Sequence, residues 1–203
     1  MNAGVTAERV YQALKAKIMG REFRPGDRLD PAALAAPLAS SVTPVRDALH
    51  LLTGEGLVET RTGGGFHVPA LDEPALSDIY AWSAELLALA IRSWPRATPP
   101  VALAHSGRND GPIAERVAHI FLALARLSSN GEHVRAIHLL NARLHAVRTV
   151  EPQVLDQVEE ELVGMTAAAI DGARDRLSRL STSYHRRRRR AAAEIVRAVY
   201  RAA

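Results

Sequence analysis

The stretch 43–53 carries polar side chains whose types and spacing suit contact with a DNA groove. Intervals of three or four residues would place them on one face of a helix, and they are Thr43, Arg46, His50 and Thr53. An arginine can donate to the O6 and N7 atoms of guanine or to a phosphate, and the first-turn N–H groups of a helix can hold a phosphate. The alternative is a solvated polar face on a small helical domain.

A second group of polar residues could bind a metal ion or an organic molecule. His138, Asn141 and His145 fall on one helical stripe, and imidazole nitrogens suit zinc or nickel. Histidines hydrogen-bonded in the domain core or at its rim are the preferred interpretation, so no metal cofactor is predicted. A largely apolar pocket for an organic effector is a further hypothesis. Its candidate residues are Trp82, Asn141, Arg143, His145 and Arg148.

No arrangement of residues in the chain predicts catalysis. The sequence contains no glycine-rich phosphate loop and no complete set of metal ligands. A nucleophile with a base and an orienting group cannot be assembled from neighbouring residues. We therefore predict no catalytic residues and no enzymatic activity.

Composition limits the class of protein further. The chain has 203 residues, no cysteine and a formal net charge of +4. Disulfides and thiolate metal sites are therefore excluded, and the charge is compatible with a polyanionic partner without demonstrating one. The polar N-terminus lacks the apolar run of a signal peptide, and no segment approaches about 18 uninterrupted apolar residues. We therefore predict a cytoplasmic protein that does not contact the membrane.

The elements that would position the first group are three helices followed by a hairpin. Apolar periodicity and turn signals predict helices over 5–19, 31–38 and 44–53 and strands over 57–61 and 66–68. Asp30 would cap the second helix and Thr43 the third, and Gly54 would end the third. A glycine-rich tip joins the two strands. This order predicts a winged helix-turn-helix domain over residues 1–70.

The remainder of the chain, 71–203, is predicted as an all-helical bundle, so the fold class is mainly α. The predicted helices are 73–94, 113–129, 132–149 and 151–172, with a Pro/Gly-rich loop over 95–112. The last stretch, 173–203, is one helix or two, with a break near 181–183.

Three further features of the helical region carry expectations. The run Arg186–Arg190 covers more than one helical turn, so solvated helix surface is preferred over contact with DNA or an acidic partner. The acidic run Glu159–Glu161 could offset this charge across an interface. Trp82 and Trp94 are expected in core or dimer packing rather than in ligand stacking.

Two blocks of sequence cover the predicted third helix and the residues just behind it. They are Thr43-Pro44-Val45-Arg46-Asp47-Ala48-Leu49 and Glu55-Gly56-Leu57-Val58. With the earlier segments Val10–Leu14 and Arg24–Asp30, they resemble the DNA-binding domain of the GntR family of transcription regulators. The resemblance covers roughly residues 5–70. The DNA-binding residues expected on this basis are Arg28, Thr43, Pro44, Arg46, His50, Arg61, Thr62 and Gly63.

Three residues depart from the family pattern. Members often have arginine where this chain has Ala32 and Val42, and both arginines usually approach DNA. Losing two cations would weaken binding or change the base preference. Pro37 lies late in the second helix, where proline removes a backbone donor.

The helical region resembles the FadR-type (FCD) effector and dimerisation domain. The segment 78–92 is similar to its first helix, and Asn141-Ala142-Arg143-Leu144-His145 is similar to its Asp-x-x-Phe-His block. Many such domains hold a divalent metal with one aspartate and three histidines. Here Asn141 and His145 would be the only matches, since Leu177 and Val199 cannot coordinate, unless His185 serves in a shifted alignment.

These features predict a DNA-binding transcription regulator, most simply a ligand-responsive repressor. It would bind a palindromic operator as a homodimer, with one recognition helix per half-site. A small-molecule effector would act by favouring one dimer geometry. The alternative is a repurposed GntR-like dimer with weak or no DNA binding, acting through ligand or protein contacts.

Overall fold

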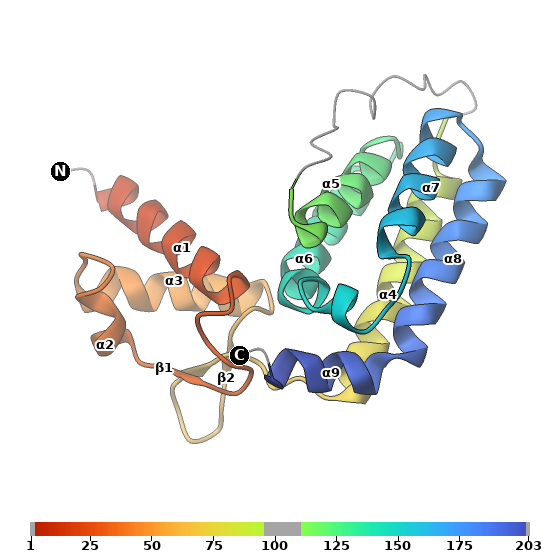
Figure 1. Ribbon diagram of the computed structural model, residues 1–203. Helices are drawn as coiled ribbons and strands as arrows, with labels where there is room; N and C mark the ends of the chain where they lie inside the picture. The colour runs from red at the N-terminus through yellow and green to blue at the C-terminus, as the bar shows by residue number, and fades with distance from the viewer. Residues whose placement is uncertain (1–2, 96–110, 202–203) are drawn as a thin grey trace. The chain divides into compact units, whose positions relative to one another are not determined.

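The computed structural model describes residues 3–95 and 111–201. The chain divides into two compact units at Leu71–Asp72, and each unit is considered by itself (Figure 1). Among the helices of these residues, none is both long and apolar enough to cross a membrane.

The N-terminal unit consists of three helices and a small antiparallel sheet. The helices are α1 (Ala3–Met19), α2 (Pro31–Ala35) and α3 (Val42–Gly54), and the strands are β1 (Arg28–Leu29), β2 (Glu59–Thr60) and β3 (Phe66–His67). The strand order is β1-β3-β2, with Leu29 and Thr60 both paired to Phe66. The structure therefore confirms the predicted helices and the wing hairpin, and adds the strand β1.

Apolar stripes on two helices build the core of this unit. Val10, Leu14 and Ile18 of α1 are buried, and so are the four apolar residues of α3, Val45, Ala48, Leu49 and Leu52. Burying each such side chain contributes about 1.5–3 kcal/mol to stability. The periodicity that predicts the helices thus also identifies the faces along which α1 packs against α3.

Of three predicted helix ends in this unit, one is confirmed and two are wrong. Asp30 caps α2 as predicted, because its side chain accepts a hydrogen bond from the Ala32 N–H. The prediction that Thr43 caps α3 is wrong, since the extended residue before this helix is Ser41, which forms no side-chain cap. The helix α2 ends at Ala35, earlier than predicted, and Pro37, two residues further along the chain, has no N–H for another helical bond.

Polar contacts from α1 orient the other two helices. The Lys15 ammonium lies 2.6 Å from Glu55 Oε2, and the Tyr11 hydroxyl donates to the same carboxylate, which joins α1 to the end of α3. Arg9 donates to the carbonyls of Leu38 and Ala39, at 2.9 and 3.0 Å. The turn between α2 and α3 is thereby held against α1.

Ala39 in this turn has a left-handed backbone, with φ 47°, which glycine adopts without the steric cost that alanine meets. We expect Ala39→Gly to raise the free energy of unfolding of the N-terminal unit by roughly 0.5–1 kcal/mol. Urea denaturation of the intact chain would measure the change. Ala36→Gly is the matched control: it is also exposed but has φ −65°, so glycine there should lower stability. Equal effects of the two variants would contradict the prediction.

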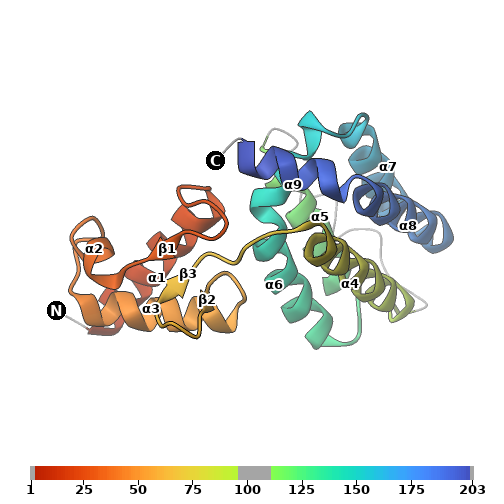
Figure 2. The same cartoon turned by 90° about the horizontal axis from the view of Figure 1, so that it is seen from below.

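The C-terminal unit is a helical bundle. Its elements are α4 (Glu73–Arg92), α5 (Ile113–Arg126), α6 (Gly131–Arg148), the short 3-10 helix η2 (Glu151–Gln153), α7 (Val158–Ile170), α8 (Arg174–Arg190) and α9 (Ala192–Arg201). The helix α4 packs against α5, α6 and α8, and α9 contacts α4, α6 and α8 (Figure 2). The core between these helices includes Leu87, Phe121 and Met165. An all-helical bundle is the predicted architecture.

Two predicted helix boundaries in this unit are wrong. The stretch 151–172 is not one helix: η2 comes first, and the left-handed residue Gln157 separates it from α7. The last stretch does form two helices, but the break lies at Ala191 and not near 181–183. The helix α8 continues through this stretch, where the Thr182 hydroxyl donates to the Ser178 carbonyl of the preceding turn at 2.9 Å.

Candidate nucleic-acid interface

The exposed face of α3 carries the polar residues that the sequence places there. Thr43, Arg46 and His50 are exposed, while the opposite side of the helix is buried. Within the residues that the structure describes, Arg46 has no hydrogen-bond or ion-pair partner, so its guanidinium is available to a ligand. Thr53 is different, because its hydroxyl already donates to the Leu49 carbonyl at 2.8 Å. Three of the four stripe residues are therefore free to contact DNA.

The wing meets this helix through one aromatic contact. The His50 and Phe66 rings are edge to face, with centroids 4.9 Å apart. Phe66 belongs to β3 and is buried. The contact therefore places the wing strands beside the exposed face of α3, with the imidazole of His50 between the two.

The tip of the wing exposes the predicted residues Arg61, Thr62 and Gly63. Gly64 and Gly65 have φ 82° and 90°, a conformation that glycine adopts at little cost. Arg61 Nε lies 2.8 Å from Glu59 Oε1, and the two side chains are 44% and 39% exposed. Such a surface pair contributes little stability, so a phosphate can compete for Arg61.

Arg28 joins the wing rather than the recognition helix. It is exposed and pairs with His67 across the sheet. A Cβ built on Gly65 would lie 3.5 Å from Arg28 Nε, so this guanidinium lies beside Gly65. Arg28 on β1 and Arg61 directly after β2 thus place a cation at each of the two outer strands of the sheet, on either side of β3. Pro44 lies half-buried in the first turn of α3.

The residues predicted to line an effector pocket in the C-terminal unit differ in their burial and do not all share the interior. Asn141 and Arg148 are buried and hydrogen-bonded to each other, with Arg148 Nη1 2.8 Å from Asn141 Oδ1. His145 is partly buried, and burial lowers its pKa. Trp82 is 48% exposed on α4 and Arg143 is exposed on α6. Trp82 and Arg143 therefore do not join Asn141 and Arg148 in the interior. By contrast Trp94 is core, as expected.

The weak metal candidates do not form a cluster with other ligands. Among the described residues, no group of three His, Cys, Asp or Glu could hold an ion. The Asn141 amide nitrogen donates to the Ala118 carbonyl at 2.8 Å. His185 also has both ring nitrogens in hydrogen bonds, to the Ser181 carbonyl at 2.8 Å and to Ser83 Oγ at 3.0 Å.

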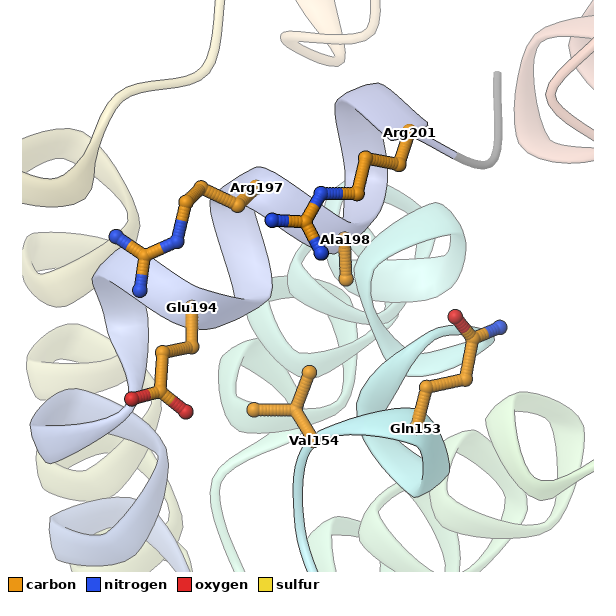
Figure 3. Close-up of a pocket in the computed structure, with 6 residues that line it drawn as sticks. All are labelled: Gln153, Val154, Glu194, Arg197, Ala198 and Arg201. Atoms are coloured by element: carbon orange, nitrogen blue, oxygen red, sulfur yellow. The ribbon is translucent and has the colours of Figure 1, made fainter.

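One surface pocket, of about 380 Å³, lies between η2 and α9 (Figure 3). Figure 3 shows Glu194, Arg197 and Arg201 of α9 on one side, with Gln153 and Val154 on the other. None of the predicted effector residues lines this pocket.

A buried charge network is the feature that sequence reasoning missed. The expectation that the arginine run is solvated is wrong for Arg188, which is completely buried. Its Nε lies 2.8 Å from Glu151 Oε2 and its Nη1 2.8 Å from Glu161 Oε2. Glu151 also accepts the Tyr80 hydroxyl at 2.5 Å. Arg187 binds Glu161 at 2.6 Å, so one member of the acidic run offsets the arginines within the chain itself.

The burial of this network and its charges shift the pKa values of Tyr80 and Arg188. Burial and the nearby Glu151 carboxylate hold the pKa of Tyr80 well above its usual value, so this hydroxyl stays a donor. Burial alone would lower the pKa of Arg188, but Tyr184 and the carboxylates of Glu151 and Glu161 raise it. Arg188 is therefore a permanent cation inside the bundle.

A winged helix-turn-helix with a free cation on its recognition helix, in a chain that continues into a helical bundle, defines a DNA-binding regulator. Residues 6–68 match the model of the gntR family of bacterial regulatory proteins. The Nta operon transcriptional regulator of Aminobacter aminovorans is 30% identical over 164 residues, which cover 75% of this chain and 78% of that protein. The chain therefore belongs to the GntR family, and it is a DNA-binding transcriptional regulator.

Other known proteins are similar to this chain in sequence or in fold. An uncharacterized HTH-type transcriptional regulator of Bacillus subtilis, YdhC, is 32% identical over 81 residues, or 40% of this chain and 36% of that one. A putative transcriptional regulator GntR from Rhodococcus sp. RHA1 has a similar fold, with a TM-score of 0.74, 20% identity and coverage of 94% of this chain and 97% of that one. For E. coli McbR/YncC the TM-score is 0.62 at 19% identity, covering 92% and 95%.

Proposed function

We propose that this regulator binds a palindromic operator as a homodimer and represses transcription until a small effector binds its helical unit, which we assign to the FadR type. The observation that carries the proposal is the exposed, unpaired Arg46 on a recognition helix whose other face is buried. The helix α3 enters the major groove, where Arg46 reads a base edge and Thr43 lies at the phosphate.

The wing supplies the second contact. Arg28 on β1 lies near Gly65 of the tip, and Arg61 follows β2 at the other edge of the sheet. Both bind phosphates that fix the register of α3 on the duplex. In a two-fold dimer, the recognition helices reach half-sites about one helical turn apart. The name of the Aminobacter relative, an operon regulator, supports a promoter as the target.

We expect Arg46→Ala to weaken binding to the operator by about 10-fold to 100-fold, because it removes a base contact that no other described side chain duplicates. Fluorescence anisotropy across a salt series, with duplex DNA from upstream of the protein's own gene, measures the loss. The matched control is Arg135→Ala, which removes the same charge from a side chain 79% exposed on α6. It should change affinity less than 2-fold.

Two further measurements complete the test. Sedimentation should give twice the mass of the 22.0 kDa chain for the free protein, and that mass plus the mass of one duplex for the complex. If the promoter fails to bind, selection from random genomic fragments identifies another operator. Salt-insensitive binding, or equal losses for the Arg46 and Arg135 variants, would contradict the proposal.

A further inference from the structure

The helix-turn-helix carries no charged side chain in the stretch that leads up to Arg46. Between Asp30 and Arg46 the sequence consists of apolar, small and hydroxyl residues, and this stretch includes all of α2 and the first turn of α3. Arg46 is therefore the first cation that α3 can present to a base. Side-chain readout by the N-terminal turn of α3 depends on hydroxyl groups or on an apolar side chain.

Val42 is an exposed apolar side chain of that turn. It is the first residue of α3 and is 38% exposed, whereas Val45 and Leu49 of the same helix are completely buried. Val42 lies four residues before Arg46, so the two side chains are neighbours on the helix surface. In a helix-turn-helix, the N-terminal residues of the recognition helix contact base edges. Val42 and Arg46 are thus placed to meet base pairs that lie close together.

An exposed valine distinguishes bases by the chemical group that it covers. In the major groove thymine presents a 5-methyl group, while the other base-edge positions present hydrogen-bond donors and acceptors. A valine against this methyl group removes apolar surface of both groups from water, which is favourable. A valine against the N4 amino group of cytosine would take a donor from water without supplying an acceptor. Valine therefore favours thymine over cytosine at the base pair that it covers.

We propose that Val42 determines specificity by contacting the 5-methyl group of one thymine in each half-site, about two base pairs from the base that Arg46 contacts. The spacing follows from the helix, since four residues rise about 6 Å along its axis and neighbouring base pairs are about 3.4 Å apart. This inference rests on the proposed function, because it requires an operator. It adds to that function the identity of one base pair and the chemical group by which that base pair is recognised.

The first experiment removes the methyl group alone. Each thymine of the operator is replaced in turn by deoxyuridine, which keeps every hydrogen-bonding group of the base, and affinity is measured by fluorescence anisotropy. We expect one thymine in each half-site to cost about 4-fold on replacement, and about 15-fold in both half-sites together, since this is the effect of burying one methyl-sized group. Binding that tolerates every uracil would overturn this proposal and leave the proposed function intact. Failure to recover any operator from genomic fragments would overturn both.

The second experiment tests whether Val42 makes the methyl contact. The Val42→Ala variant should bind the thymine operator at least about 4-fold more weakly, and uracil at the sensitive position should then change its affinity less than about 2-fold. Leu51→Ala is the matched control, because Leu51 is also apolar, is 60% exposed and lies in the second half of α3. It should keep the full loss on uracil replacement. Sensitivity that survives in Val42→Ala, or that disappears in both variants, would overturn the proposal.

A third variant, Val42→Arg, should exchange one base preference for another. Arginine donates to the O6 and N7 atoms of guanine, so this variant should bind about 10-fold more tightly when guanine replaces the sensitive thymine, whereas the wild-type chain should bind that operator more weakly. Because Val42 is exposed, the Tm of each variant should stay within about 2 °C of the wild-type value, which separates base recognition from folding. A Val42→Arg variant that still prefers thymine would contradict the proposed contact.

Discussion

Replacing Glu151 by glutamine is expected to lower the free energy of unfolding of the C-terminal unit by about 3–5 kcal/mol. Glu151 is completely buried and carries one of the two carboxylates that neutralise Arg188. Glutamine has nearly the same shape, so the loss comes from the charge and not from packing. Arg188 would then keep only Glu161, whose side chain is 16% exposed and already shared with Arg187.

Urea denaturation of the intact chain, followed by circular dichroism, would measure this change. Glu132→Gln is the matched control, because its pair with Arg135 is 72% and 79% exposed, and its loss should cost less than about 0.5 kcal/mol. The double variant Glu151→Met/Arg188→Met should recover much of the stability, since apolar residues of similar volume often replace a buried pair without loss. A loss below about 1 kcal/mol in Glu151→Gln would contradict this account of the network.

The C-terminal unit is also expected to lose stability as the pH falls below 6.5, because of His185. Burial lowers the pKa of His185 to about 3, and its ring is hydrogen-bonded in the neutral form to Ser83 and Ser181. The unfolded chain takes up a proton near pH 6.5, whereas the folded chain does not until about pH 3. The stabilisation is therefore complete above pH 6.5 and is lost progressively down to about pH 3, with a total of roughly 4–5 kcal/mol.

The diagnostic window is pH 6.5 to 5, above the range where carboxylates titrate. There the free energy of unfolding should fall by about 2 kcal/mol for one histidine, and His185→Gln should reduce this slope. His145, whose pKa burial also lowers, adds to the slope and is tested separately as His145→Gln. The exposed His138 serves as the control, and His138→Gln should leave the slope unchanged. An unaltered slope in His185→Gln would show that this histidine is protonated in the folded chain.

The sequence by itself determined the N-terminal unit and most of its candidate interface. Val45, Ala48 and Leu49 repeat with the period of a helix, and this repeat assigns Arg46 to the exposed face without knowledge of any other element. The helix caps and the glycines of the wing also act locally, because each sets the backbone of only a few neighbouring residues. Helix periodicity and turn chemistry are local properties, which is why they can be read from neighbouring residues.

Only the tertiary structure decided the polar interior of the C-terminal unit. The partners of Glu151 lie 71 residues before it, at Tyr80, and 37 residues after it, at Arg188. An arginine in a run of five has the same local pattern whether it is solvated or buried. Its burial depends on which distant side chains supply the opposite charge, because removing a charge from water is unfavourable unless a partner compensates it. For the same reason the sequence could name Arg148 as a candidate, but only the fold showed that it lies enclosed beside Asn141 and Phe121 without a carboxylate.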